Sequence, residues 1–206
     1  SSAASDVYKR QAAAREIGGV QIQASGTIGG NLCTASPAGD SIPCLMTLNA
    51  AIELASRRGA RRLPLNEFLT GPRQTACAPD ELVTAVYVPS DAEMGVGGFE
   101  KLGARRYLVI SIAMTAARLS IADGRIGDAA ISVGACAPVA VRLTELEAGL
   151  RGMAYDMAGD FIRDSRSGIM AALSPIDDVR GTAGYRRDAA AEIVARLVER
   201  LCGEFG

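Results

Sequence analysis

The stretch GTIGGNLCTASPAGDSIP, residues 26–43, combines two adjacent glycines, one asparagine, several small residues and one isolated acid. Gly29 and Gly30 carry no Cβ and reach positive φ, so the backbone here can turn sharply and bring successive N–H groups close to a ligand such as a phosphate. The same Gly-Gly-Asn sequence is also typical of an ordinary turn between two strands. The local pattern leaves both interpretations open.

The residues on either side of this stretch predict a strand before it and a helix at its end. Val20 and Ile22 alternate with polar residues and run into the glycine pair, which indicates a short strand followed by a loop. Asp40 and Ser41 precede an Ile-Pro step, where an acid or a hydroxyl caps free N–H groups and proline fits the first turn. We therefore expect a short helix over residues 42–47, with Asp40 as a candidate cap.

Further along, the chain predicts more strands and then a boundary. Alternation over residues 52–65, interrupted at Arg58-Gly59, predicts a hairpin, and DELVTAVYVP at residues 80–89 predicts another strand. The Gly-rich segment SDAEMGVGG, residues 90–98, indicates a domain boundary. Four arginines at the hairpin tip form either a docking patch or an ordinary solvated surface; they are Arg57, Arg58, Arg61 and Arg62.

The segment after this boundary predicts strands first and helices afterwards. Alternation and β-branched residues indicate strands near residues 99–102, 109–121 and 126–133, with an Asp-Gly hairpin turn before the last. Helical spacing then indicates helices near residues 143–150 and 156–173, and a third over GYRRDAAAEIVARLVERLCGEF, in which Arg186 is assigned to the water-facing side. The predicted fold class is therefore α+β, with a three-stranded antiparallel sheet packed with three helices.

Composition narrows the possible functions. The 206 residues are 49% hydrophobic with a net charge of −1, so the chain can build a core but has no broad basic surface for nucleic acid or an anionic membrane. No run reaches the roughly 18 apolar residues of a membrane span, so a cytoplasmic protein is the default expectation. There is no histidine, and the five cysteines include no C-x-x-C pair. We therefore predict no metal site and no catalytic residue, and any chemistry has to come from a cofactor or another chain.

The first residues differ in character from the rest. SSAASDVYKRQ, residues 1–11, is polar, has no apolar periodicity and joins abruptly to AAAREIGGVQ. It resembles read-through of a sequencing adapter, so we expect a non-native leader and a missing true N-terminus. A natural flexible tail is the alternative.

Several motifs together resemble one known family. TIGGNLCTASPAGDSIP closely resembles the second FAD-binding motif of the medium, flavin-carrying subunit of molybdenum hydroxylases, the family of xanthine dehydrogenase and aerobic carbon monoxide dehydrogenase. The resemblance continues in order through LNEFLTGPRQTACAPDELVTAVYVP, FEKLGARR, ISIAMTAARL, ISVGACAP and SPIDDVRGTAGYRR. It implies that residues 12–90 are a partial FAD-binding domain, the second lobe of a two-lobed domain, and that residues 97–206 are the family's C-terminal flavoprotein domain.

The resemblance also implies the residues that bind the cofactor. Backbone N–H groups and short side chains around the FAD pyrophosphate would come from Thr27, Gly29, Gly30 and Asn31. A simple turn is the alternative for the glycines.

Three further residues are assigned to the cofactor in the same way. Asp40 would accept hydrogen bonds from FAD, Val83 would lie against it, and Lys101 would lie near the flavin, where a cation favours the anionic reduced ring. A helix cap, a strand-core valine and a surface salt bridge are the respective alternatives.

By resemblance, the chain is the FAD-binding electron-transfer subunit of an oxidoreductase complex. Substrate would be oxidised at a molybdenum cofactor in a large subunit, and [2Fe–2S] clusters in a small subunit would pass electrons to FAD and on to NAD⁺, oxygen or a quinone. The family's earlier Gly-rich FAD loop is absent from this sequence, so we expect an N-terminally truncated chain with half of the FAD cradle missing. A stand-alone flavin oxidase of the same fold and a non-catalytic interaction module are the alternatives.

Overall fold

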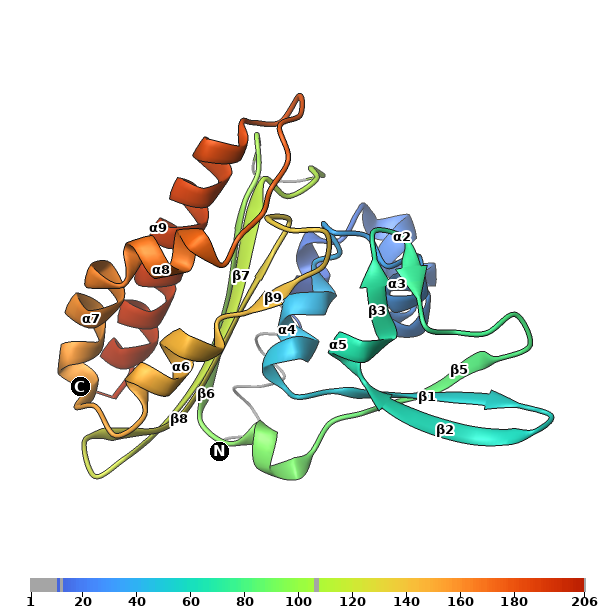
Figure 1. Cartoon of the computed structure of the whole chain (residues 1–206), viewed down its shortest axis with the longest axis horizontal. Helices are drawn as coiled ribbons and strands as arrows, with labels where there is room; N and C mark the ends of the chain where they lie inside the picture. The colour runs from blue at the N-terminus through green and yellow to red at the C-terminus, as the bar shows by residue number, and fades with distance from the viewer. Residues whose placement is uncertain (1–10, 12, 106–107, 206) are drawn as a thin grey trace.

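Two lobes, each with its own antiparallel sheet, lie side by side along the longest axis of the molecule (Figure 1). The computed structural model describes residue 11 and residues 13–105 and 108–205. We call residues 13–93 the N-terminal lobe and residues 96–205 the C-terminal lobe. Residues 1–10 of the predicted leader lie outside the described residues.

The N-terminal lobe begins with short helices and continues into a small sheet. The helices are α2 (Val20–Ser25), α3 (Ile28–Thr34) and α4 (Ser41–Thr47), and the sheet strands are β1 (Ala51–Ser56), β2 (Gly59–Pro64) and β5 (Leu82–Tyr87), in the order β2-β1-β5. Between β2 and β5 lie the single turn α5 (Leu65–Phe68) and a separate hairpin of β3 (Leu69–Gly71) and β4 (Gln74–Thr75). The predicted hairpin, the helix near residues 42–47 and the strand within residues 80–89 are confirmed.

The core of this lobe lies between its sheet and its helices. Inward-facing side chains of β1 meet those of α3, α4 and α5 in one cluster that contains Leu32, Leu45, Ile52 and Phe68, all buried. Ile52 pairs with Leu63 across the hairpin, so the inward face is apolar at this end of the ribbon. Burial of that face explains why the alternation in the sequence predicts the hairpin correctly.

The C-terminal lobe is a sheet covered by helices. After the 3₁₀ turn η1 (Ser90–Glu93), the strands β6 (Val96–Leu102), β7 (Ala113–Ala122), β8 (Arg125–Gly134) and β9 (Val141–Arg142) pair in chain order. One face of the sheet is covered by α6 (Thr144–Leu150), η2 (Tyr155–Met157), α7 (Ala158–Asp164), α8 (Arg166–Ala171) and α9 (Ala183–Gly203) (Figure 1). The α+β class is confirmed.

Helix α4 packs on the opposite face of this sheet and joins the two lobes (Figure 1). Cys44 of α4 is buried in one cluster with Phe99, Met114 and Ala116 of the sheet. A Cβ placed on Gly134 of β8 would lie 2.9 Å from Cγ of Pro43, so the helix approaches the strand closely. Because both faces of β7 are covered, its first seven residues are all buried, and apolar and polar residues do not alternate along this part of the strand.

The strand predicted around residues 20–22 is wrong. Residues 20–25 form helix α2, in which the N–H of Gly26 donates to the carbonyl of Ile22 and the hydroxyl of Ser25 donates to the carbonyl of Gln21. None of the residues of α2 is buried, and Val20 and Ile22 are exposed. Two alternating apolar residues do not define a strand when no burial selects one face.

The C-terminal lobe differs from the prediction in three details. The sheet has a fourth strand, β9, whose two residues are too few to show alternation. The single helix predicted over residues 156–173 is η2, α7 and α8, because the chain leaves helical geometry at Ser165 between α7 and α8. Arg186 is 4% exposed, so its assignment to the water-facing side of α9 is wrong.

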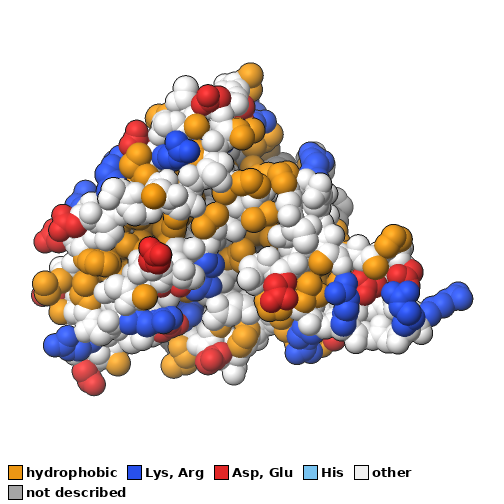
Figure 2. Space-filling view, viewed as in Figure 1, with side chains coloured by type: hydrophobic (Ala, Val, Ile, Leu, Met, Phe, Trp, Pro, Cys, Tyr) orange, Lys and Arg blue, Asp and Glu red, His pale blue; other side chains and the backbone are white. Residues whose placement is uncertain are grey.

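The arginines of the β1–β2 hairpin are exposed, and three of them, Arg58, Arg61 and Arg62, pair with nearby acids. Figure 2 shows charged side chains of both signs gathered at the right end of this face, where the hairpin lies. Arg58 lies 2.6 Å from Asp80, and Arg61 lies 2.7 Å from Glu81. This internal pairing supports the interpretation of a solvated surface.

Candidate functional site

The glycine pair lies in the first turn of α3. Thr27 precedes the helix in an extended conformation, and its Oγ1 accepts a hydrogen bond from the N–H of Gly30 at 3.0 Å. The Thr27 carbonyl accepts the next hydrogen bond, from the N–H of Asn31, also at 3.0 Å. Neither Gly29 nor Gly30 has a positive φ, so the predicted sharp turn is wrong. The Thr27 cap favours helical geometry here instead.

Two N–H groups at the start of α3 remain open to a ligand. The first N–H groups of an α-helix have no intrahelical acceptor, and Thr27 takes only the one on Gly30. Within the described part of the chain, no acceptor is found for the N–H groups of Ile28 and Gly29. Adjacent amide donors of this kind suit an anionic oxygen.

The side chains around this helix start come from two other elements. A Cβ placed on Gly29 would lie 3.9 Å from Cγ1 of Val83, so β5 passes beside the glycine at van der Waals distance. Asn31 accepts a hydrogen bond through Oδ1 from the hydroxyl of Ser41 at 2.5 Å, which links α3 to the start of α4. The structure thus brings the predicted residues Thr27, Gly29, Gly30, Asn31 and Val83 into one region.

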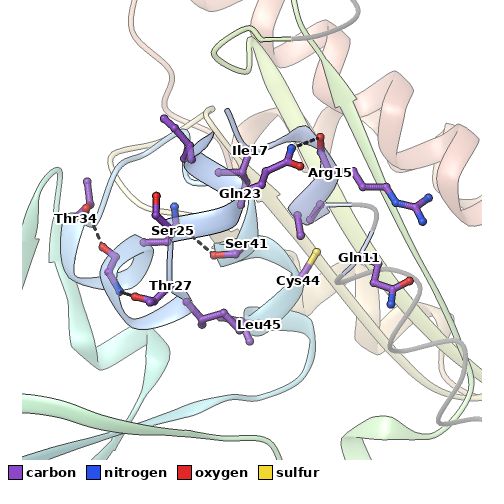
Figure 3. A pocket seen from close by; sticks show the side chains of 17 residues that line it. Gln11, Arg15, Ile17, Gln23, Ser25, Thr27, Thr34, Ser41, Cys44 and Leu45 are labelled. Carbon is purple, nitrogen blue, oxygen red and sulfur yellow. Dashed lines mark hydrogen bonds between the residues drawn. The ribbon is translucent and has the colours of Figure 1, made fainter. Parts of the chain in front are cut away.

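A cavity of about 690 Å³ opens beside this helix start (Figure 3). Its lining comes from α2, α3 and α4, including Thr27, Ser41 and Leu45, and from five residues that precede α2, which are Gln11, Ala13, Ala14, Arg15 and Ile17. Arg15 is the one charged side chain among the described residues that line it. A concave, mostly uncharged pocket with a few polar groups is typical of a cofactor site.

These residues fit one part of a dinucleotide cofactor. The open N–H groups suit a phosphate, and Gly29 adds no side chain beside Val83, so a ligand can approach the backbone at this point, which lies next to the residues that line the cavity. A Cβ on Gly30 would lie 3.1 Å from the Thr27 hydroxyl, so a larger residue there would disturb the cap. Geometry and donor chemistry are therefore compatible with FAD.

Asp40 and Lys101 form a second group, a buried ion pair between the lobes. The ammonium of Lys101, near the end of β6, lies 2.6 Å from Oδ2 of Asp40, just before α4, and the two side chains are 7% and 6% exposed. The hydroxyl of Ser111 donates to Oδ1 of Asp40 at 2.7 Å. We call these three residues the inter-lobe cluster.

The inter-lobe cluster changes the predicted role of Asp40. Asp40 stands at the start of α4, but its side chain makes no capping hydrogen bond, so the predicted cap is wrong. The carboxylate is instead taken by a lysine and a serine from the other lobe, which are stronger partners than a single amide. Ser111 was missed because it lies within the apolar run ISIAM, and no local pattern distinguishes it.

The two groups are neighbours but are not the same site. Ser41, which binds Asn31, directly follows Asp40 in the sequence. Lys101 lines a different cavity, of about 500 Å³, together with Phe99, Gly103 and other residues. The predicted cofactor residues therefore lie in two adjacent places connected by the start of α4.

The remaining reactive side chains of the described residues form no metal-binding group, and two of the thiols are unreactive. Among the described residues, no group of three His, Cys, Asp or Glu side chains is placed to hold a metal ion. Burial raises the pKa of the Cys136 and Cys202 thiols to about 11, which leaves both unreactive near neutral pH. No helix within the described ranges is long and apolar enough to cross a bilayer.

Two family models together match most of the chain. Residues 1–91 match the model described as the FAD binding domain in molybdopterin dehydrogenase. Residues 99–201 match the model described as the CO dehydrogenase flavoprotein C-terminal domain.

Individual proteins show the same similarity. The nicotine 6-hydroxylase medium subunit of Paenarthrobacter nicotinovorans is 34% identical over 188 residues, which are 91% of this chain and 64% of that protein. The carbon monoxide dehydrogenase medium chain of Afipia carboxidovorans is 32% identical over 87% of this chain and 62% of that protein. The chain therefore spans less than two thirds of the length of these relatives.

A solved structure gives the corresponding comparison of folds. A chain of the carbon monoxide dehydrogenase from Hydrogenophaga pseudoflava, in a form that lacks the Mo-pyranopterin moiety of the molybdenum cofactor, superposes with a TM-score of 0.86 at 26% identity. The alignment covers 93% of this chain and 66% of that chain.

Proposed function

This chain belongs to the FAD-binding medium subunits of the molybdenum hydroxylases, and we propose that it holds FAD at the start of α3 as part of an oxidoreductase complex. The observation that carries the proposal is the helix start itself. Two open N–H groups, on Ile28 and Gly29, lie at the start of a helix that borders a cavity of about 690 Å³, in the segment that matches the FAD binding domain.

In this proposal the residues of α3 bind the pyrophosphate. Gly29 allows close approach, its N–H and that of Ile28 donate to phosphate oxygens, and Thr27 and Gly30 keep the turn in place through their hydrogen bond. Asn31 is oriented by Ser41, which leaves its amide nitrogen free to donate. Orientation of the cofactor by fixed dipoles is the contribution that this chain makes.

We assign the other three predicted residues to the same cofactor. Val83 lies beside Gly29 and offers an apolar contact, and Lys101 lines the second cavity. Asp40 acts through its bonds to Lys101 and Ser111, which hold the C-terminal lobe against α4. A buried lysine paired in this way supplies a fixed cation whose field is partly balanced by the carboxylate.

The wider activity follows the family. When bound, FAD would supply the redox chemistry, receiving electrons from [2Fe–2S] clusters of a small subunit and passing them to NAD⁺, oxygen or a quinone. We propose that the small iron–sulfur subunit and a large subunit with a molybdenum cofactor are the partners of this chain in the cytoplasm. The observed lobes supply binding and orientation.

A fluorescence titration of FAD against this chain, completed with the preceding FAD-binding lobe of a family relative, tests the proposal. Gly29→Ala adds one methyl group that the free protein accommodates, because its nearest contact is Val83 Cγ1 at 3.9 Å. Alanine also favours a helix over glycine by about 1 kcal/mol, so the variant should stay folded. We expect the FAD dissociation constant of this variant to rise at least about tenfold, since the methyl group occupies the place of approach.

Gly168→Ala is the matched control. Gly168 also lies in a short helix, α8, and a Cβ there meets no other atom within 4 Å, so this variant should bind FAD like the parent chain. If Gly29→Ala holds FAD as tightly as the control, the glycine pair is not the cofactor site. A folded parent chain that is completed with the preceding FAD-binding lobe and still shows no FAD binding would favour the interaction module. FAD binding with no electron uptake from an iron–sulfur partner would favour the stand-alone oxidase.

A further inference from the structure

Arg186, in the first turn of α9, is buried although it carries a full charge. Its Nη1 donates to the carbonyls of Ile112, at 3.2 Å, and Ala135, at 3.1 Å. Its Nη2 donates to the carboxylate of Asp178. Nε is buried and has no hydrogen-bond partner among the described residues. A charge held in this way needs a physical reason beyond stability, because a buried ion pair is often no better than apolar packing.

Both carbonyls that Arg186 holds belong to segments that reach Asp40. Ile112 directly follows Ser111, whose hydroxyl donates to Asp40. The N–H of Ala135 donates to the carbonyl of Pro37 at 2.9 Å, and Pro37 lies three residues before Asp40. One guanidinium group therefore holds two separate backbone segments, each of which contacts or adjoins the inter-lobe cluster.

Asp178 holds the guanidinium from the other side. It lies in the connection between α8 and α9, which extends past the end of the sheet toward the β6–β7 connection (Figure 1). Its carboxylate also accepts hydrogen bonds from the backbone N–H of Arg180, at 2.8 Å, and from the Arg180 side chain, at 2.7 Å. The connection is thereby ordered around the same carboxylate that orients Arg186.

We propose that Arg186, oriented by Asp178, is a positioning residue that fixes the geometry of the Asp40–Lys101 pair. The planar guanidinium donates to two carbonyls and one carboxylate at once, which the single ammonium of lysine cannot reproduce in that fork geometry. The sequence separation between Arg186 and Ile112 is 74 residues, so the contact ties the last helix of the chain to the connection that carries Ser111.

The consequence of this positioning for FAD binding rests on the proposed function. Ser41 follows Asp40 and binds Asn31 at the proposed FAD site, so a displaced Asp40 would also displace α3. Lys101 would move away from its cavity wall when its carboxylate partner moves. The positioning role itself can be measured without the cofactor.

The reactivity of the Lys101 amine reports the state of the cluster. The chain contains two lysines, Lys9 and Lys101, so peptide mass spectrometry assigns acetylation by acetic anhydride directly to each. In Asp178→Asn and Arg186→Lys, we expect the rate of acetylation at Lys101 to rise at least about tenfold, because this is the typical effect of losing a hydrogen bond to a charged group. Asp178→Glu keeps the charge and should restore a rate near that of the parent chain.

Asp188→Asn is the matched control, because it removes an exposed carboxylate from the same helix. Asp188 pairs with Arg166 at 2.9 Å, and its side chain is 56% exposed, so Lys101 should react as in the parent chain. Amide hydrogen exchange at Val194, in the core of α9, distinguishes positioning from general loosening. Positioning predicts faster acetylation of Lys101 with unchanged exchange at Val194.

Two outcomes would overturn the proposal. One is an unchanged Lys101 rate in folded Asp178→Asn, which retains the native fold more readily than the Arg186 variant because Asp178 is partly exposed. The other is a rise of equal size in Lys101 acetylation and Val194 exchange, which would assign Arg186 to stability alone. An FAD titration of the same proteins keeps the two claims separate. A parent chain that is completed with the preceding FAD-binding lobe and still lacks FAD affinity refutes the proposed function, while the acetylation rates decide the positioning role.

Discussion

Removing one charge of the Asp40–Lys101 ion pair should lower the free energy of unfolding strongly. Removing both charges should lower it by much less than the sum of the two single losses. The Lys101 nitrogen lies 2.6 Å from Asp40, and both side chains are at most 7% exposed, so neither charge can turn to water. Removing one partner of a buried pair typically costs about 3–5 kcal/mol, because the other charge stays buried and unpaired. We expect Asp40→Asn and Lys101→Met each to lower the free energy of unfolding by about 3 kcal/mol, at the lower end because Ser111 remains as a partner of residue 40.

The double variant separates charge pairing from packing. With both charges removed, no isolated ion remains, so the loss should be smaller than the sum of the two single losses by at least about 2 kcal/mol. Total stabilities of about 5–15 kcal/mol keep each variant folded enough to measure. The assay is urea unfolding followed by circular dichroism, with the denaturant slope checked for two-state behaviour.

A surface pair on α9 provides the comparison. Arg196 and Glu192 lie 2.7 Å apart but are 68% and 41% exposed, so their coupling should be only about 0.3–0.5 kcal/mol. The distance is nearly the same as in the buried pair, whereas the two pairs differ widely in burial. A coupling between Asp40 and Lys101 no larger than that of the surface pair would refute the argument that burial makes this ion pair hold the lobes together.

Three further experiments test other parts of the structure. Gly134→Val should lower the free energy of unfolding by about 1–3 kcal/mol in thermal denaturation, because its Cβ would overlap Cε of Met114 and lie 2.9 Å from Cγ of Pro43; an unchanged midpoint would contradict the close packing of Met114 and Pro43 against this part of β8. Iodoacetamide at pH 8 should modify the exposed Cys33 well before Cys136, whose pKa is raised to about 11 by burial, and mass spectrometry showing equal rates would disagree. The backbone N–H of Arg180, followed by the Arg186 guanidinium, lowers the pKa of Asp178 to about 2. Since the unfolded value is about 3.9, the contribution of this carboxylate to stability is present above roughly pH 4 and is lost as the pH falls toward 2. Asp178→Asn should therefore reduce the fall in urea midpoint over that interval, and an identical acid dependence would count against the pairing.

The sequence correctly predicted the strands and helices that a pattern among neighbouring residues marks. The β1–β2 hairpin could be recognised because one face of it is buried, and α9 because its apolar stripe repeats at helical spacing over 21 residues. The order of strands followed by helices predicted the α+β class. The same reasoning failed where local burial is absent, as in α2, or where an element is two residues long, as in β9.

The sequence predicted which residues belong to the candidate site but not how they are arranged. The motif around the glycine pair indicates Thr27, Gly29, Gly30 and Asn31 because they are adjacent, and the structure keeps them together in one helical turn. The conformation of that turn was not predictable from the glycines, because the hydroxyl of Thr27 favours a helix where glycine alone permits several conformations. The helical conformation determines which backbone N–H groups remain without a partner and can bind a ligand.

By itself, the sequence determined most of the longer strands and helices, the absence of histidine chemistry and the motif that marks the family. Only the tertiary structure decided which charges meet. Asp40 and Lys101 are 61 residues apart in the chain, and Arg186 and Ile112 are 74 residues apart. No periodicity links positions at such distances, so Arg186 reads as one more polar residue on an amphipathic helix. Its charge is buried because the packing of α9 on the sheet leaves two carbonyls and a carboxylate that only a forked donor at that position can satisfy.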